Sequence, residues 1–313
     1  MNDFSTIAII GAGAVGGYYG GRLAEHGRQV HFLLRSEFEA WKTNGLRVQS
    51  IDGDFTLAPD RLNIYNNSAA MPQADLVIVT LKTTENRHLQ NLIAPLLHAN
   101  SVIVTLQNGL GNEQTLGDLF GPARIVGGMA FTCINRVEPG VIHHSDYGLI
   151  RLGEFAQPAS ADRCRQIADM FNASQIRAEI TENLLAARWD KQVWNIPFNG
   201  LGALLDASTD RLIAGEQGTA VVRALMNEVI QTAAANGITL HPQTAEQKIA
   251  ITRTMGAYLT STQVDRRLGK PMEIEAIFGK TVAAARAAKV AVPLLEMLYF
   301  SLGQIDERNG SPG

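Results

Sequence analysis

The sequence predicts an α/β domain with a parallel sheet, followed by a domain built only of helices. Three observations lead to this fold class. An apolar run of strand length, Ile7–Ile10, is followed at once by glycines at helical spacing. Residues 75–82 and 101–107 form continuous apolar runs, which are typical of parallel strands buried on both faces. Helical patterns dominate the rest of the chain, so we expect domains of residues 1–181 and 182–313.

Composition narrows the class of protein. The chain has 313 residues, of which 46% are hydrophobic and 18% charged, as in ordinary globular proteins of two domains. Its net charge of −3, without a basic block, argues against nucleic acid and anionic membranes as partners. No apolar run reaches the roughly 20 residues of a membrane helix, and no secretory signal is expected. Cys133 and Cys164 lack metal-ligand spacing, so we expect buried thiols, no metal site and a cytoplasmic location.

The other predicted elements follow from apolar periodicity and turn residues. In the first domain we expect a hairpin turn at Asp52–Asp54 and further strands at Gln29–Leu34, Ile125–Thr132, Gly140–His144 and Gly148–Leu152. A leucine-rich helix is expected to end at Leu97, and one more helix and strand between Phe155 and Asn183. In the second domain the expected helices are Asn183–Ala203, Gly218–Asn236, Pro242–Ala257 and Pro271–Lys289.

The first strand leads into a G-x-G-x-x-G turn formed by Gly11, Gly13 and Gly16. The first glycine permits the sharp turn, the second lets a pyrophosphate approach the backbone, and the third lets the helix pack on the sheet. The helix start then offers free N–H groups to phosphates. This context predicts a dinucleotide site, although a glycine-rich turn without a ligand remains the alternative. The candidate residues of this turn are Gly11, Ala12, Gly13, Ala14, Val15 and Gly16.

The ends of the later strands carry polar side chains that a cofactor or substrate could meet. Where many dinucleotide folds have an acidic residue after the second strand, this chain has Arg35 and Ser36, which suit a 2′-phosphate and favour NADP over NAD. A solvated loop arginine is the alternative. Lys82 and Asn108 follow two buried strands at the sheet edge where ligands bind. Asn108 with Gly109 could also be only a turn.

A polar stripe crosses an otherwise buried helix in the second domain. Lys191, Asn195 and Asn199 are four residues apart, so they share one helix face, and Pro197 predicts a kink nearby. One amine and two amides are costly to bury without partners. A lysine that reaches water beside two structural amides is the alternative. Further along the chain, Glu273 and Glu275 are expected to point to different helix faces, one of them toward the core, where a carboxylate would need a cationic partner.

These segments resemble the ketopantoate reductase (2-dehydropantoate 2-reductase) family. The matching stretches are GAGAVGGYYGGRLA near the start, VTLKT at 79–83, LQNGLGNE at 106–113, RWDKQVWNIPFNGLGAL at 188–204, and STQVD with GKPMEIEAIFG within 261–279. The resemblance implies a Rossmann-type NADP-binding domain, a helical domain similar to the C-terminal domain of 6-phosphogluconate dehydrogenase, and an active site in the cleft between them. Thr209 departs from an asparagine that touches substrate in some members.

The resemblance also implies the role of each residue. Lys191 would act as general acid toward the keto oxygen, and Glu273 would orient it and contact the substrate and cofactor. Asn195, Asn199, Ser261 and Asn108 would bind substrate. Lys82 and Asn108 would line the nicotinamide region, and Arg35 would hold the 2′-phosphate of NADPH.

The expected reaction is the NADPH-dependent reduction of 2-dehydropantoate to (R)-pantoate, a step toward coenzyme A. An ammonium can stabilise and protonate the oxygen that hydride addition leaves negative. Two alternatives are a reductase of another branched 2-keto acid or lactone, and a binding protein that senses NADP(H) without turnover. The sequence permits a homodimer but does not require one.

Overall fold

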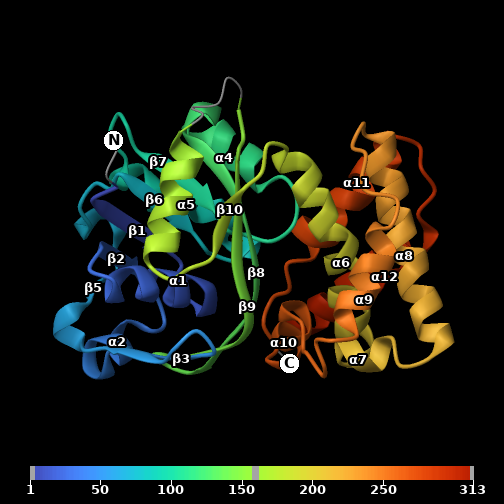
Figure 1. The fold of residues 1–313 in the computed structure, drawn as a ribbon, viewed down its shortest axis with the longest axis horizontal. Helices are drawn as coiled ribbons and strands as arrows, with labels where there is room; N and C mark the ends of the chain where they lie inside the picture. Colours follow the sequence, from blue (N-terminus) through green and yellow to red (C-terminus); the bar gives the residue numbers. More distant parts are fainter. Residues whose placement is uncertain (1–3, 157–161, 311–313) are drawn as a thin grey trace. The chain divides into compact units, whose positions relative to one another are not determined.

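The computed structural model describes residues 4–156 and 162–310 of the chain. It forms two compact units, which are Met1–Gln107 with Asn112–Leu184 and Asn108–Gly111 with Leu185–Gly313. In Figure 1 the strands run from blue to green and the helices of the second unit from yellow to red. We propose residues 1–181 and 182–313 as the two functional domains.

The first unit is built on one sheet, which has ten strands within the described residues. The strands are β1 (Thr6–Ile10), β2 (Gln29–Leu33), β3 (Leu46–Ser50), β4 (Phe55–Leu57), β5 (Asn63–Tyr65), β6 (Leu76–Val79), β7 (Val102–Thr105), β8 (Ile125–Glu138), β9 (Val141–Glu154) and β10 (Ala178–Ile180). Their order is β4-β3-β9-β8-β7-β6-β1-β2-β5, with β10 beside β9. Six neighbouring strands in this sheet, β5-β2-β1-β6-β7-β8, are parallel. Their connections follow the order 3-2-1-4-5-6 of a Rossmann fold, which confirms the predicted fold class.

The helices of the first unit connect these strands. The α-helices are α1 (Ala14–Glu25), α2 (Phe38–Asn44), α3 (Leu89–Ile93), α4 (Asn112–Phe120) and α5 (Arg163–Ala173). The 3₁₀ turns are η1 (Pro59–Arg61), η2 (Ser68–Ala70), η3 (Thr83–His88), η4 (Ala94–Leu96) and η5 (Pro122–Arg124). Along β1, Ile7 and Ile9 join one apolar cluster while Ala8 and Ile10 join another. Both faces of the sheet are therefore buried at its central strands β1, β6 and β7, as the continuous apolar runs predict.

The second unit is helical and has its own apolar cluster. Its α-helices are α6 (Leu184–Leu205), α7 (Thr209–Leu212), α8 (Glu216–Ala235), α9 (Thr244–Thr252), α10 (Ser261–Arg267), α11 (Lys280–Ala287) and α12 (Pro293–Gly310), and η6 (Glu275–Gly279) is a π-helical turn. Helix α6 continues through Pro197. No helix among the described residues combines the length and apolar character that a membrane crossing requires.

Several predicted elements differ from the structure. The two strands expected at Gly140–His144 and Gly148–Leu152 are one strand, β9. Its pairing with β8 continues through local register shifts, so the irregular residues between the two halves do not end the strand. The helix expected to end at Leu97 is divided into η3, α3 and η4, and Pro95, which cannot donate a helical hydrogen bond, accounts for the end of α3. The helix expected over Pro271–Lys289 begins only at residue 274 and contains the π-helical turn. The sequence predicts no helix at the positions of α10 and α12.

His144 of β9 contacts an acidic side chain in the turn between β3 and β4, a partner that the linear sequence does not reveal. The buried ring of His144 lies 3.7 Å, through Nδ1, from Asp52 Oδ2. The hydroxyl of Tyr18 donates to the same Asp52 oxygen at 3.3 Å. Burial lowers the pKa of His144, and Asp52 opposes this shift. The cluster fixes the turn between β3 and β4, which the sequence does place at Asp52–Asp54.

Candidate active site

The glycine turn at the end of β1 has the geometry that its spacing predicts. Gly11 has φ of +99°, and a Cβ atom there would lie 2.6 Å from the backbone nitrogen of Leu81. A Cβ at Gly16 would lie 2.6 Å from the Gly11 carbonyl oxygen, so the start of α1 packs tightly on the turn. Neither position tolerates a side chain without a shift of backbone.

Gly13 differs from its two neighbours in the motif. A Cβ at Gly13 would meet no atom within 4 Å, so the backbone there borders open space. Gly13 is also the N-cap of α1, whose first N–H groups have no partner inside the helix. Ala12, Ala14 and Val15 pack against the core beneath. A pyrophosphate fits this arrangement, because the backbone can approach it and the helix start favours negative charge.

Two basic candidates follow neighbouring strands of the same unit. Arg35 comes two residues after β2, and its guanidinium is exposed and lies 3.2 Å, through Nη1, from Glu85 Oε2. Lys82 comes three residues after β6 and is half-buried. The buried side chain of Gln107 donates from Nε2 to the carbonyl of Leu81 at 2.9 Å, which holds the chain just before Lys82. The structure thus places both basic residues at the carboxyl edge of the sheet.

The second unit holds the amine of Lys191 in a buried position on α6. Lys191 is only 8% exposed, so it does not reach bulk water. Its Nζ donates to Asn108 Oδ1 at 3.0 Å, and Asn108 belongs to the same compact unit although it follows β7 in the chain. Burial lowers the pKa of Lys191 to about 7, the nearby Arg188 guanidinium adds to this effect, and the Glu273 carboxylate opposes it. A lysine poised near neutrality can act as acid or base.

The π-helical turn η6 fixes the segment that carries Asn108. The backbone nitrogen of Leu110 donates to the Ala276 carbonyl at 2.9 Å. Gly109 has φ of +86°, and any Cβ there would collide with the same carbonyl. The buried side chain of Gln192 donates from Nε2 to the Ile277 carbonyl at 2.6 Å. Single π-helical turns recur at functional sites, and this one ties α6 to the segment before Lys280.

The two amides of the predicted stripe have different surroundings. Asn195 is buried and donates from Nδ2 to Gln192 Oε1 at 3.5 Å. Asn199 Oδ1 accepts from the Thr262 nitrogen at 3.3 Å, from Thr262 Oγ1 at 3.0 Å and from Ser261 Oγ at 3.3 Å. Asn199 therefore holds the start of α10, as the structural alternative for this amide anticipates. Its amide oxygen also fixes the exposed Ser261 hydroxyl.

The structure thus groups the candidates in two sets. One set lies in the first unit and contains Gly11, Ala12, Gly13, Ala14, Val15, Gly16, Arg35 and Lys82. The other lies in the second unit and contains Asn108, Lys191, Asn195, Asn199, Ser261 and Glu273. Glu273, which precedes the helix that begins at residue 274, is buried, and Glu275 is exposed, so Glu273 is the one of the two that faces the core. In the described ranges, no three His, Cys, Asp or Glu side chains are grouped so that they could hold a metal ion.

Three residues with a part in this geometry were missed from the sequence. Arg188 lies three residues before Lys191, so helical spacing alone could have placed it on the same face. Gln192 contacts η6 through Nε2 and Asn195 of the polar stripe through Oε1, and its contact with η6 depends on tertiary packing. Glu85 contacts Arg35 because the two residues follow β6 and β2, which lie on either side of β1 in the sheet. The linear sequence does not show this strand order.

The pKa of Lys191 predicts how the activity of a general acid depends on pH. If Lys191 is the general acid of the keto acid reduction that the family resemblance implies, it donates only when protonated, so kcat/KM should be constant well below pH 7 and fall about tenfold per pH unit above it. Oxidation of the corresponding hydroxy acid needs the neutral amine, so its kcat/KM should rise over the same window. Steady-state rates in both directions, at saturating cofactor, measure these profiles.

Glu273→Gln provides the control for this pH dependence. The carboxylate opposes the lowering of the Lys191 pKa, so its removal should move the fall in kcat/KM to lower pH. A profile whose midpoint stays in place in this variant would separate Glu273 from the titration of Lys191.

Comparison with known proteins gives a consistent result over the whole chain. The family model described as ketopantoate reductase PanE/ApbA matches residues 7–157, and its C-terminal counterpart matches residues 183–306. A 2-dehydropantoate 2-reductase of Nostoc sp. is 42% identical over 306 residues, which cover 96% of this chain and 95% of that protein. The crystal structure of 2-dehydropantoate 2-reductase from Geobacter metallireducens GS-15 has a TM-score of 0.92 and 44% identity, covering 96% of this chain and 99% of that one. The enzyme from Methylococcus capsulatus gives a TM-score of 0.86 at 33% identity, with 98% of each chain covered.

Proposed function

Because this chain belongs to the ketopantoate reductase family, we propose that it catalyses the NADPH-dependent reduction of 2-dehydropantoate to (R)-pantoate. The observation that carries the proposal is the buried Lys191 amine, which is hydrogen-bonded to Asn108 and has a pKa of about 7. Such an amine can deliver a proton to a carbonyl oxygen at neutral pH.

NADPH, when bound, would supply the hydride that adds to C2 of the keto acid. The residues that would hold it are the glycine turn from Gly11 to Gly16, with Arg35 on the 2′-phosphate and Lys82, Asn108 and Glu273 toward the nicotinamide. The open space beside Gly13 and the start of α1 support the placement of the pyrophosphate.

Lys191 would complete the reduction by proton transfer. As the hydride adds to C2, the C=O π electrons move onto oxygen, and the Lys191 ammonium donates one proton to it, which leaves a neutral amine and a hydroxy acid. The amine then regains a proton from solvent. The hydrogen bond to Asn108 Oδ1 fixes the direction of Nζ, and the buried surroundings strengthen the interaction of the ammonium with the developing negative charge.

The other polar residues of the second unit would position the substrate. Asn195 and Asn199 offer amide donors to the substrate carboxylate, and Ser261, whose proton is donated to Asn199, offers an oxygen that accepts from a substrate hydroxyl. The orientation of Ser261 by Asn199 supports this role. Glu273 would balance the charge of Lys191 and hold it in place.

The decisive experiment measures loss of NADPH absorbance with a panel of 2-keto acids. We expect kcat/KM for 2-dehydropantoate to exceed that for branched 2-keto acids without its hydroxyl by at least about tenfold, because a site built for a hydroxyl rejects analogues that lack it. A higher kcat/KM for another keto acid or lactone would reassign the substrate within the same enzyme class.

One observation bears on the alternative substrate. Thr209, which replaces an asparagine of some family members, is buried, and its Oγ1 donates to the Gly256 carbonyl at 3.1 Å. The hydroxyl is thus used within the protein, so recognition of the substrate would depend on the other polar residues. The second alternative, a sensor without turnover, requires NADPH binding with no oxidation by any keto acid in the panel.

The remaining proposals concern location and assembly. We propose that the enzyme acts in the cytoplasm, and the buried thiols of Cys133 and Cys164, neither of which forms a disulfide, support this. We also propose a homodimer, since Met297 and Phe300 lie three residues apart on α12 and are 50% and 69% exposed. Sedimentation equilibrium measures the oligomeric state.

A further inference from the structure

The guanidinium of Arg35 is paired with a carboxylate from another part of the first unit. Arg35 follows β2, Glu85 lies in η3 after β6, and β1 lies between these two strands in the sheet. The 3.2 Å contact from Arg35 Nη1 to Glu85 Oε2 therefore joins two strand ends on either side of the strand that leads into the glycine turn. This pair lies in the region where a Rossmann fold binds the adenosine half of a dinucleotide.

A second acidic residue near Arg35 has other partners. Glu37 is buried, its Oε2 accepts from the Gly140 nitrogen at 3.0 Å, and its Oε1 lies 3.0 Å from Arg136 Nη1. Glu37 thus belongs to the support of the β8–β9 hairpin. Among the described residues, Glu85 is the acidic side chain that forms an ion pair with Arg35.

The chemistry of a carboxylate beside this arginine differs between the two nicotinamide cofactors. A 2′-phosphate carries close to two negative charges at neutral pH, so it would compete with Glu85 for the guanidinium and be repelled by the carboxylate. A 2′-hydroxyl can instead donate a hydrogen bond to a carboxylate. Arg35 and Glu85 therefore favour opposite cofactors.

We propose that Glu85 is a specificity-determining residue that reduces the preference for NADPH over NADH set by Arg35. This inference rests on the proposed function, because it takes Arg35 to be the residue that meets the 2′-phosphate. The ratio of the affinities for NADPH and NADH is therefore smaller with Glu85 present than it would be with Arg35 alone.

The exposure of the pair shows that this effect is separable from folding. The Arg35 side chain is 85% exposed and that of Glu85 25% exposed, so their ion pair contributes little to stability. The exposed arginine can rotate toward a phosphate when one binds. His88 Nε2 lies 3.8 Å from the same Glu85 oxygen and gives the carboxylate a second neighbour.

The test is Glu85→Gln, which keeps the size of the side chain and removes its charge. Titration calorimetry with adenosine 2′,5′-bisphosphate and with adenosine 5′-monophosphate isolates the 2′-phosphate from the rest of the cofactor. We expect the Kd of the bisphosphate to fall about three- to tenfold and that of the monophosphate to stay the same or rise, as for an exposed charge pair. NADPH and NADH should follow the same order.

Glu179→Gln is the matched control. Glu179 forms an ion pair at 2.5 Å with Arg151 in the same unit, and its side chain is 46% exposed against 25% for Glu85, so this variant makes the same change in net charge away from Arg35. It should leave both Kd values unchanged. An equal change for both probes in Glu85→Gln, or no change for the bisphosphate, would overturn the proposal.

Failure of this inference differs from failure of the proposed function. If the bisphosphate responds as expected while no keto acid is reduced, the selectivity role of Glu85 stands and the reductase activity falls. If 2-dehydropantoate is reduced and the two adenosine probes respond equally, the reductase activity stands and the selectivity role of Glu85 falls. A wild-type chain that binds neither probe overturns the role of Glu85.

Discussion

Lys191→Ala is expected to lower kcat for keto acid reduction by about 10²- to 10⁴-fold, the usual range for the loss of a general acid. The amine is buried, hydrogen-bonded to Asn108 and has a pKa of about 7, so it combines access to a proton with a fixed direction. Alanine removes both the proton and the positive charge that would stabilise the alkoxide. Stopped-flow single-turnover measurements of NADPH oxidation report the chemical step directly.

Lys248→Ala is a suitable control for this variant. Lys248 is a second lysine of the same unit, and its Nζ forms an ion pair at 2.6 Å with Asp190 on α6, the residue before Lys191. It lies outside the candidate set, so kcat should stay within about twofold of wild type, because loss of such a pair costs little. If Lys191→Ala turned over as fast as Lys248→Ala, Lys191 would have no place in proton transfer.

Sequence patterns predicted most of the fold because local physics determines much of it. The glycine spacing after β1 required a strand, a sharp turn and a tightly packed helix, and each is present. The continuous apolar runs of β6 and β7 predicted strands buried on both faces. Periodicity was less informative where a chain bends without losing its pairing, so β9 was divided in two.

The predicted polar stripe illustrates what helical spacing can and cannot establish. Lys191, Asn195 and Asn199 are all buried, as their position among apolar neighbours indicates. Spacing could not show that Asn199 supports the start of α10, because that contact joins residues about 60 positions apart. The family resemblance, which the comparisons confirm, supplied the roles that spacing could not.

Contacts between segments that are distant in the chain could not be predicted from the sequence. The pairing of Arg35 with Glu85 depends on the order β6-β1-β2, and the attachment of Asn108 to the helical unit depends on the π-helical turn at Glu275–Gly279. Neither follows from propensity or periodicity. Arg35 and Asn108 are both candidates that the sequence identifies. Their contact partners become visible only in the structure.

Arg35→Ala is expected to raise the Kd of NADPH about 10- to 100-fold and to leave that of NADH within about twofold of wild type. Charge-assisted hydrogen bonds from a guanidinium to a phosphate are among the stronger polar interactions, and only NADPH carries the 2′-phosphate. Because the side chain is exposed, its loss should not destabilise the fold. Fluorescence titration with each cofactor measures the two Kd values.

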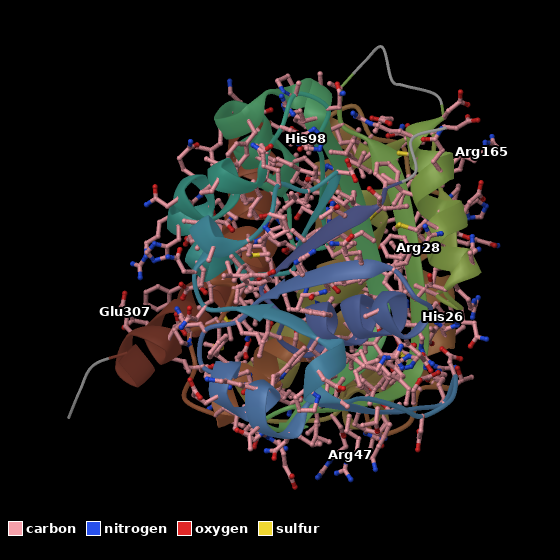
Figure 2. The ribbon with its side chains drawn as sticks, turned by 90° about the vertical axis from the view of Figure 1, so that its left-hand side faces the viewer. His26, Arg28, Arg47, His98, Arg165 and Glu307 are labelled. Atoms are coloured by element: carbon pink, nitrogen blue, oxygen red, sulfur yellow. The ribbon has the colours of Figure 1, made fainter. Side chains whose placement is uncertain are left out.

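Arg47→Ala tests whether any loss of positive charge from the first unit has the same effect. Figure 2 shows the labelled basic side chains Arg47, His98 and Arg165 at separate places on this unit, and Arg47 is an exposed residue of β3. This control should change neither Kd, since screening at physiological salt limits long-range effects to about 8 Å. Equal weakening of NADPH and NADH by Arg35→Ala would remove Arg35 from 2′-phosphate recognition. Arg35→Lys should give an intermediate Kd, because an ammonium keeps the charge without the planar, two-pronged geometry.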